Sequence, residues 1–313
     1  MSDTFRKRGI YLSVAIPLVG LILLPILFTH REDVANLMLL VLFYISIAQS
    51  WNLLGGYAGQ VNLGYAAFFG LGSLVTRQLW LSFQVAYPLA LLAGTATSAL
   101  FALMVGAPTL RFKGPYFVFG TFALGEILRI IVTNVFPKLS FLSGDRVSNY
   151  NITSRYFFSL ALAVFVTGLV HFVSRSRLGM AMKAVREDEV AAEATGINTL
   201  RPKLVAFTLS ALLAGLCGGF FAFYHISYYH SYPFSPFWTF DAMFITYVGG
   251  VGTIVGPALG AVFFVLLREQ LALRIPTGEI HLMIFGTLFI LVVLILRRGL
   301  FEPIEKLFKS FSR

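Results

Sequence analysis

The feature that most constrains this chain is a series of apolar runs, each close to the roughly 20 residues that a helix needs to cross a bilayer. Of its 313 residues, 58% are hydrophobic and only 12% are charged. A chain this long and this apolar cannot bury its surface in one soluble core. The sequence therefore predicts an all-α polytopic integral membrane protein with about eight to ten transmembrane elements, forming one domain over residues 1–313.

Basic residues at the ends of the apolar runs predict the orientation in the membrane. Arg6, Lys7 and Arg8 precede the first run, Ile10 to Thr29, so we expect a cytoplasmic N-terminus and a retained span rather than a signal peptide. Arg77 is an exception, because it falls on what should be the outer side. The net charge of +10 fits cytoplasmic loops against anionic lipid better than nucleic acid. The expected location is the inner (cytoplasmic) membrane.

The position of the C-terminus depends on the segment Asp241 to Gln270. A single crossing there would leave the basic C-terminal tail outside, against the positive-inside rule. A re-entrant pair broken between Gly249 and Pro257 would put that tail inside, and we favour this reading. The final span is then His281 to Leu296, followed by a short amphipathic helix over Leu300 to Phe311 on the inner surface.

A polar island at residues 174–203 lies between two long apolar runs and holds the densest cluster of charge. Its apolar stripe stops at Asp188, which predicts two short helices, the second capped by Asp188 and ended by Gly196. Ala191, Ala192 and Ala194 would give the second helix a thin surface on which a partner's groove could close. A solvated loop helix that binds nothing is an equally good reading of this pattern.

Two glycine-rich segments, Gly55 to Leu74 and Tyr247 to Phe264, contain too many glycines for ordinary spans. The glycines either allow close helix packing or break the backbone so that it lines a cavity. Uncharged amides near the first segment favour the second explanation. The similar glycine patterns suggest an internal repeat of two halves, each with a broken helix, and such pairs commonly mark a transport path. The path residues that we predict are Gln49, Asn52, Gly56, Gln60, Asn62, Glu126 and Gly250.

Glu126 and Arg129 form an ionisable pair about one helical turn apart inside an apolar run. An ionisable group in a span is a functional hypothesis by default. The alternative is a structural pair in which the two side chains neutralise each other's charge, and we favour this alternative.

The sequence offers no pattern for catalysis or metal binding. It lacks a phosphate-binding G-x-x-x-x-G-K-[ST] motif, so we expect no ATP hydrolysis and no cofactor in this chain. Cys217 is a single cysteine inside an apolar run, and His225 and His230 lack a convincing third ligand. Asn151 to Thr153 matches a glycosylation acceptor only weakly. A transporter of this kind needs a gradient or a partner as its energy source.

Four stretches resemble one known family. The run RLGMAMKAVREDEVAAEATGI, Arg177 to Ile197, resembles the cytoplasmic loop of the branched-chain amino acid permeases of ABC importers, of the LivM and LivH type and nearest to LivM. Asn52 to Leu74, Pro108 to Arg129 and Val248 to Ala261 are also similar to that family, so the resemblance extends roughly over Ile45 to Leu271. The outer loop LSGDRVSNYNIT departs from it, which leaves the cargo and the binding-protein contact open.

The resemblance implies the permease half of an ABC importer for leucine, isoleucine, valine or related small amino acids. Its implied partners are a related LivH-like permease, two ATPase subunits that bind ATP-Mg, and an extracytoplasmic substrate-binding protein. The residues implied to contact the ATPase are Arg186, Glu187, Asp188, Glu189, Ala191, Ala192 and Gly196. The rival reading is a proton- or sodium-coupled secondary carrier in which Glu126 and Asp241 bind the coupling ion.

Overall fold

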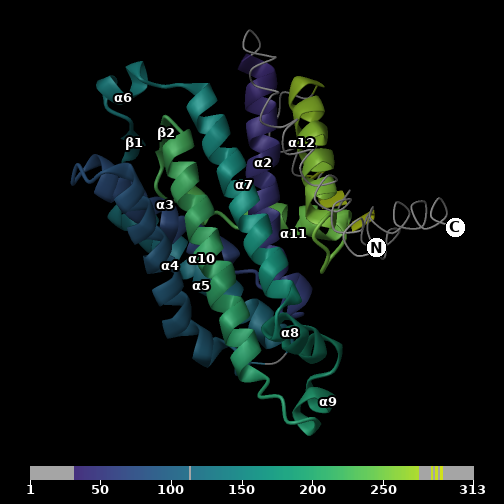
Figure 1. The fold of residues 1–313 in the computed structure, drawn as a ribbon. Helices are drawn as coiled ribbons and strands as arrows, with labels where there is room; N and C mark the ends of the chain where they lie inside the picture. The colour runs from purple at the N-terminus through teal and green to yellow at the C-terminus, as the bar shows by residue number, and fades with distance from the viewer. Residues whose placement is uncertain (1–31, 113, 275–282, 285, 288–289, 292–313) are drawn as a thin grey trace, which may run out of the picture.

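The computed structural model describes residues 32–112, 114–274, 283–284, 286–287 and 290–291 (Figure 1). The predicted first span and the C-terminal amphipathic helix lie outside the described residues, and so does most of the predicted final span. The elements are α2 (Glu32–Asn52), η1 (Leu53–Tyr57), α3 (Tyr65–Leu81), α4 (Tyr87–Thr109), α5 (Pro115–Val135), β1 (Leu139–Phe141), α6 (Gly144–Ser148), α7 (Ile152–Arg175), α8 (Arg177–Glu187), α9 (Glu189–Ala194), α10 (Leu200–Tyr224), β2 (Ser227–Tyr229), η2 (Tyr232–Phe234), α11 (Phe237–Gly249) and α12 (Gly256–Arg274).

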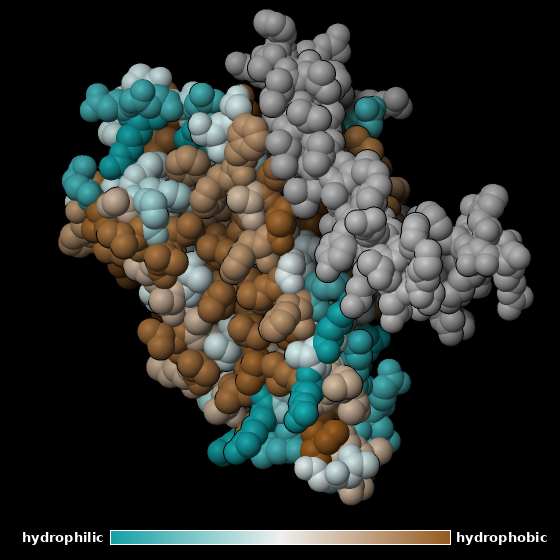
Figure 2. Space-filling model, in the orientation of Figure 1, coloured by the Kyte–Doolittle hydropathy of each residue, from teal (hydrophilic) through white to brown (hydrophobic). Residues whose placement is uncertain are grey.

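The prediction of an all-α polytopic membrane protein is confirmed. Within the described residues, 5 helices are long and apolar enough to cross a membrane: Asp33–Tyr57, Tyr87–Thr109, Pro115–Val135, Ile152–Arg175 and Leu200–Tyr224. Apolar side chains cover the middle of the face in Figure 2, and polar ones gather toward its two ends. The total number of spans in the whole chain stays a prediction.

Small residues bring the central helices α3 and α10 close together. A Cβ added at Gly72 would lie 2.1 Å from the carbonyl oxygen of Gly215, and one at Gly218 would lie 1.9 Å from the carbonyl oxygen of Phe69. Only glycine permits such backbone contact. Around these helices, α4 packs against both, and α2 packs against α7 and α12. In the later part of the first glycine-rich segment, the glycines therefore serve close packing.

The two ends of the bundle differ in what they carry. The helices α8 and α9 lie at the lower end in Figure 1, while α6, β1 and β2 lie at the upper end. There β1 and β2 pair antiparallel, with Leu139 opposite Tyr229. We call these the island end and the sheet end.

The second glycine-rich segment is broken, as the sequence predicts. The helix α11 has only 13 residues and ends at Gly249, and α12 begins at Gly256 after a turn in which Gly250 and Gly252 have φ of 134° and 76°. The two helices pack against each other, so the chain reverses at this turn. Residues beyond Arg274 decide where the C-terminus lies, and the described residues do not reach it.

Candidate functional site

The first island helix, α8, is fixed to the bundle. Ser176 caps it, accepting a hydrogen bond on Oγ from the amide of Gly179 at 3.3 Å. Gly179 lies so close to the end of α7 that a Cβ there would come within 2.4 Å of the carbonyl oxygen of Val173. Met182 and Val185, one turn apart, are buried. Consequently α8 presents one apolar face to the bundle and its remaining faces to solvent.

The predicted division of the island into two helices is confirmed. The helix α8 ends at Glu187, and the Oδ1 atom of Asp188 accepts hydrogen bonds from the amides of Val190 and Ala191 at 2.9 and 3.0 Å. Asp188 therefore caps α9 by satisfying amides that have no partner within the helix. Gly196 follows α9 in the left-handed region, at φ 86°.

The predicted ATPase-contact residues separate into two groups. Five are exposed, namely Arg186, Glu187, Asp188, Ala191 and Gly196. Ala192 is buried, and Glu189 is held by an ion pair at 2.6 Å to the buried ammonium of Lys203. Val190 is the one large apolar side chain of α9 and is 75% exposed, but it is not among the predicted contact residues. The signal was present, since it is the largest apolar side chain in a helix otherwise made of alanine and glutamate.

The two glycine-rich breaks meet beside the island. The first break is η1, a π-helical turn at the end of α2, and the second is the turn between α11 and α12. Asn52 connects them, donating to the carbonyl oxygen of Thr253 at 2.8 Å and accepting from the amide of Gly252 at 2.9 Å. Gln49, one turn earlier, donates to the carbonyl oxygen of Ile254. We call this contact between η1 and residues 250–255 the glycine junction.

The island touches the glycine junction directly. The guanidinium of Arg186 donates from Nη1 to the carbonyl oxygen of Gly56 in η1. The ammonium of Lys183, also on α8, lies 5.7 Å from the ring centroid of Tyr57. Four residues that the sequence assigned to two separate roles, Gln49, Asn52, Gly56 and Arg186, thus lie in one cluster.

The amide side chains predicted to line a path are mostly engaged with the protein itself. Gln49, Asn52 and Asn62 are buried. The Oδ1 atom of Asn62 accepts from the amide of Gly64 at 2.8 Å, and its carbonyl oxygen accepts from the indole of Trp51 at 3.0 Å. Gln60 is half-buried. In this conformation the three buried amides hold the broken backbone in place.

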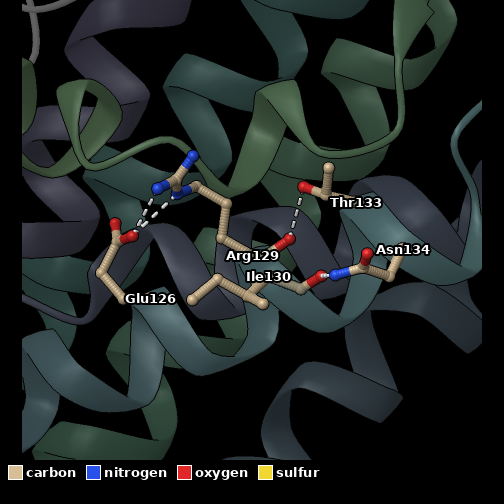
Figure 3. A network of polar contacts seen from close by, with 5 residues as sticks. All are labelled: Glu126, Arg129, Ile130, Thr133 and Asn134. Atoms are coloured by element: carbon tan, nitrogen blue, oxygen red, sulfur yellow. Dashed lines mark hydrogen bonds and ion pairs between the residues drawn. The ribbon is translucent and has the colours of Figure 1, made fainter.

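Glu126 lies in the middle of α5, where its carboxylate points toward the guanidinium of Arg129 (Figure 3). Its Oε2 atom accepts from Nε and Nη2 of Arg129 at 2.9 and 2.6 Å. Its Oε1 atom is buried, with no hydrogen-bond partner among the described residues. Arg129 keeps 42% of its side chain exposed, and Thr133 continues the polar stripe one turn further. This pairing fits the hypothesis of a structural ion pair. The Oε1 atom of Glu126 could still accept a hydrogen bond from one more donor.

A third ion pair joins α11 and α12, the helices on either side of the 250–255 turn. Asp241 on α11 lies 3.9 Å from Nη1 of Arg268 on α12, and Arg268 also donates to the hydroxyl of Tyr44 on α2. Among the described residues no group of three or more His, Cys, Asp or Glu side chains is placed to hold a metal ion. His225 and His230 instead bond to the carbonyl oxygen of Phe221 and to Gln78.

Comparison with known proteins decides the family. The family described as "Branched-chain amino acid transport system / permease component" matches residues 34–293. The chain belongs to this permease family. It is 28% identical to the permease protein LivM of Salmonella typhimurium over 86% of this chain and 69% of that one, and 27% identical to LivM of Escherichia coli over 90% and 74%. Both relatives are named high-affinity branched-chain amino acid transport system permease proteins.

One relative has a different cargo in its name. The permease protein NupQ of Bacillus subtilis, named as part of a guanosine ABC transporter, is 27% identical over 53% of this chain and 59% of its own. No solved structure matches the chain. The family resemblance predicted from the sequence is confirmed, and this member is a membrane permease.

Proposed function

We propose that this permease carries branched-chain or related small amino acids into the cytoplasm as a subunit of an ABC importer. The observation that carries the proposal is the island: α8 is anchored on the bundle and α9 extends from it with an exposed Val190 and Ala191. A surface of this shape suits contact with a separate protein. The names of the LivM relatives supply the cargo class.

In this assembly the chain pairs with a related LivH-like permease, two ATPase subunits that bind ATP-Mg, and an extracytoplasmic substrate-binding protein. The island end and both termini then face the cytoplasm, and the sheet end faces outward at the inner membrane. Arg186 to Gly196 supply the ATPase contact. Cargo passes beside the glycine junction and the polar stripe of α5, which includes Glu126.

The carboxylates named for a secondary carrier are a reason to prefer the importer. Glu126 and Asp241 each lie beside an arginine, at 2.6 and 3.9 Å. In each pair the arginine already occupies the position beside the carboxylate that a coupling ion would have to take. This arrangement favours an energy source outside the chain.

Reconstitution in proteoliposomes tests the function. The complex with its ATPase and binding protein should take up leucine only when ATP is present on the side of the membrane where the ATPase lies. An uncoupler should leave this uptake unchanged. Parallel assays with guanosine decide between amino-acid and nucleoside cargo. Uptake that continues without the ATPase and stops with the uncoupler would establish the carrier instead.

The docking surface is tested by the paired change Val190→Glu and Ala191→Arg. Both side chains are exposed, so membrane insertion and folding should be unaffected while co-purification with the ATPase is lost. Changes at Glu189 or Ala192 are less suitable, because these residues are held within the island itself. Asn198→Arg, at an exposed position outside α9, is the matched control and should keep the complex intact.

A further inference from the structure

The side chain of Arg186 occupies a space made by two glycines on different elements. A Cβ added at Gly59 would lie 2.8 Å from its Cγ, and one at Gly252 would lie 2.4 Å from its Nη1. Both glycines are in the left-handed region, at φ 70° and 76°. No side chain fits at either position unless Arg186 moves. The side chain of Arg186 therefore lies against the backbone beside both breaks, although the residue as a whole stays exposed.

The carbonyl group that accepts the hydrogen bond of Arg186 lies where the regular hydrogen bonding of α2 has ended. Gly56 lies in η1, where the α-helical hydrogen-bond pattern of α2 has changed to a π turn. Such turns are rare and are frequently found at functional sites. A guanidinium always carries its charge and has several donors, so Arg186 stabilises this turn while remaining part of α8.

We propose that Arg186 is the positioning residue through which movement of the island reaches the glycine junction. Displacement of α8 by a docked partner would withdraw the guanidinium from Gly56 and Gly252 together. Both breaks would then be free to rearrange at the same moment, although one follows α2 and the other lies between α11 and α12. Asn52 keeps the two breaks together during this change. The inference rests on the proposed function and adds the route from the ATPase contact to the transport path.

The test compares Arg186→Ala, Arg186→Lys and Arg177→Ala in the reconstituted complex with the ATPase and binding protein. Arg177 is an exposed arginine at the other end of α8, and its variant should transport like the unchanged protein. For Arg186→Ala we expect an intact complex that hydrolyses ATP but takes up leucine at least tenfold more slowly. Arg186→Lys keeps a donor and should recover part of that loss.

A second measurement uses the permease without its partners. Cys217 is the single cysteine and is buried, so a Cys217→Ser protein with Val251→Cys carries one thiol at a half-buried position of the glycine junction. Adding Arg186→Ala should raise its rate of reaction with a small thiol reagent at least fivefold, because the junction loosens. Arg177→Ala should leave that rate unchanged.

The outcomes separate the two proposals. If the unchanged complex shows no ATP-driven uptake, the proposed function is wrong, whatever the thiol reaction shows. If it does transport, uptake within twofold of normal in Arg186→Ala, or an unchanged thiol reaction rate, overturns the role of Arg186. Arg186 also lies at the start of the proposed ATPase contact. Loss of the ATPase from the Arg186→Ala complex would mean that Arg186 acts by docking alone, and it would therefore also overturn the role at the glycine junction.

Discussion

Two arginines stabilise the opposite ends of this permease in different ways. At the sheet end, Arg77 is 1% exposed and makes five hydrogen bonds, to Ser140, Ala222, His225 and Ile226. At the island end, Arg186 is an exposed residue with one hydrogen bond among the described residues, to Gly56. The sheet end is therefore joined by a buried guanidinium with many partners, whereas the island arginine reaches the bundle through a single, partly exposed contact.

The position of Arg77 explains its departure from the charge rule. Four of its hydrogen bonds are to backbone carbonyl oxygens, and those of Ala222 and His225 lie at the C-terminus of α10. Carbonyl groups at the end of a helix lack intrahelical partners and carry partial negative charge. Arg77 satisfies them and joins α10 to β1, so it acts as a buried structural cation rather than as a signal for orientation.

The largest effect that we predict is for Arg77→Met. It removes all five hydrogen bonds and leaves buried carbonyl oxygens without donors, so the free energy of unfolding should fall by about 4 kcal/mol or more. Denaturation of the purified permease in detergent measures this. Arg146→Met is the control at the same end, since Arg146 has one hydrogen bond and stacks on Trp80, and it should cost about 1 kcal/mol. Equal losses would contradict the special contribution of Arg77 to this end.

Asn52→Ala tests the glycine junction itself. The change removes two hydrogen bonds between the end of α2 and the 250–255 turn and should lower the free energy of unfolding by about 2 kcal/mol, since bonds between helices in membranes each contribute modestly. Ser46→Ala is the matched control, because the one partner of the Ser46 hydroxyl in the described part of the chain is Leu42 of the same helix. If both variants unfold alike, the junction contributes nothing beyond the packing of α2.

The sequence predicted local features of the chain better than contacts between residues far apart in the sequence. The two island helices, the Asp188 cap and the break after Gly249 follow from patterns within a few residues, because capping and turn conformation are local properties. The contact of Arg186 with Gly56 joins residues 130 positions apart, and Arg77 reaches carbonyl groups up to 149 positions away. No local pattern carries that information. For the same reason, the hydrogen bonds by which Gln49 and Asn52 connect the two breaks could not be predicted, and the assignment of these residues to a path stays a prediction.

Asp188→Ala should produce a smaller and more local effect. Loss of the cap removes the acceptor for the amides of Val190 and Ala191 and should destabilise α9 by about 1 kcal/mol. Hydrogen exchange at these two amides should accelerate about fivefold, while exchange in α8 stays unchanged. Asp188→Asn keeps a capping oxygen without the charge and should restore most of the protection. Acceleration that extends into α8 would mean that the two island helices are one unit.

The smallest effect on the isolated permease is expected at the ion pair of α5. Arg129 and Glu126 have 42% and 22% of their side chains exposed, so solvent screens them, and a double-mutant cycle with Glu126→Gln and Arg129→Gln should give a coupling free energy below about 1 kcal/mol. The same cycle in the assembled complex distinguishes two surroundings. If the pair stays open to a water-filled path, its coupling will not change. If another subunit covers α5, removal of water will strengthen the interaction between the two charges. A coupling free energy above about 2 kcal/mol in the complex would show that the transport path does not run beside Glu126.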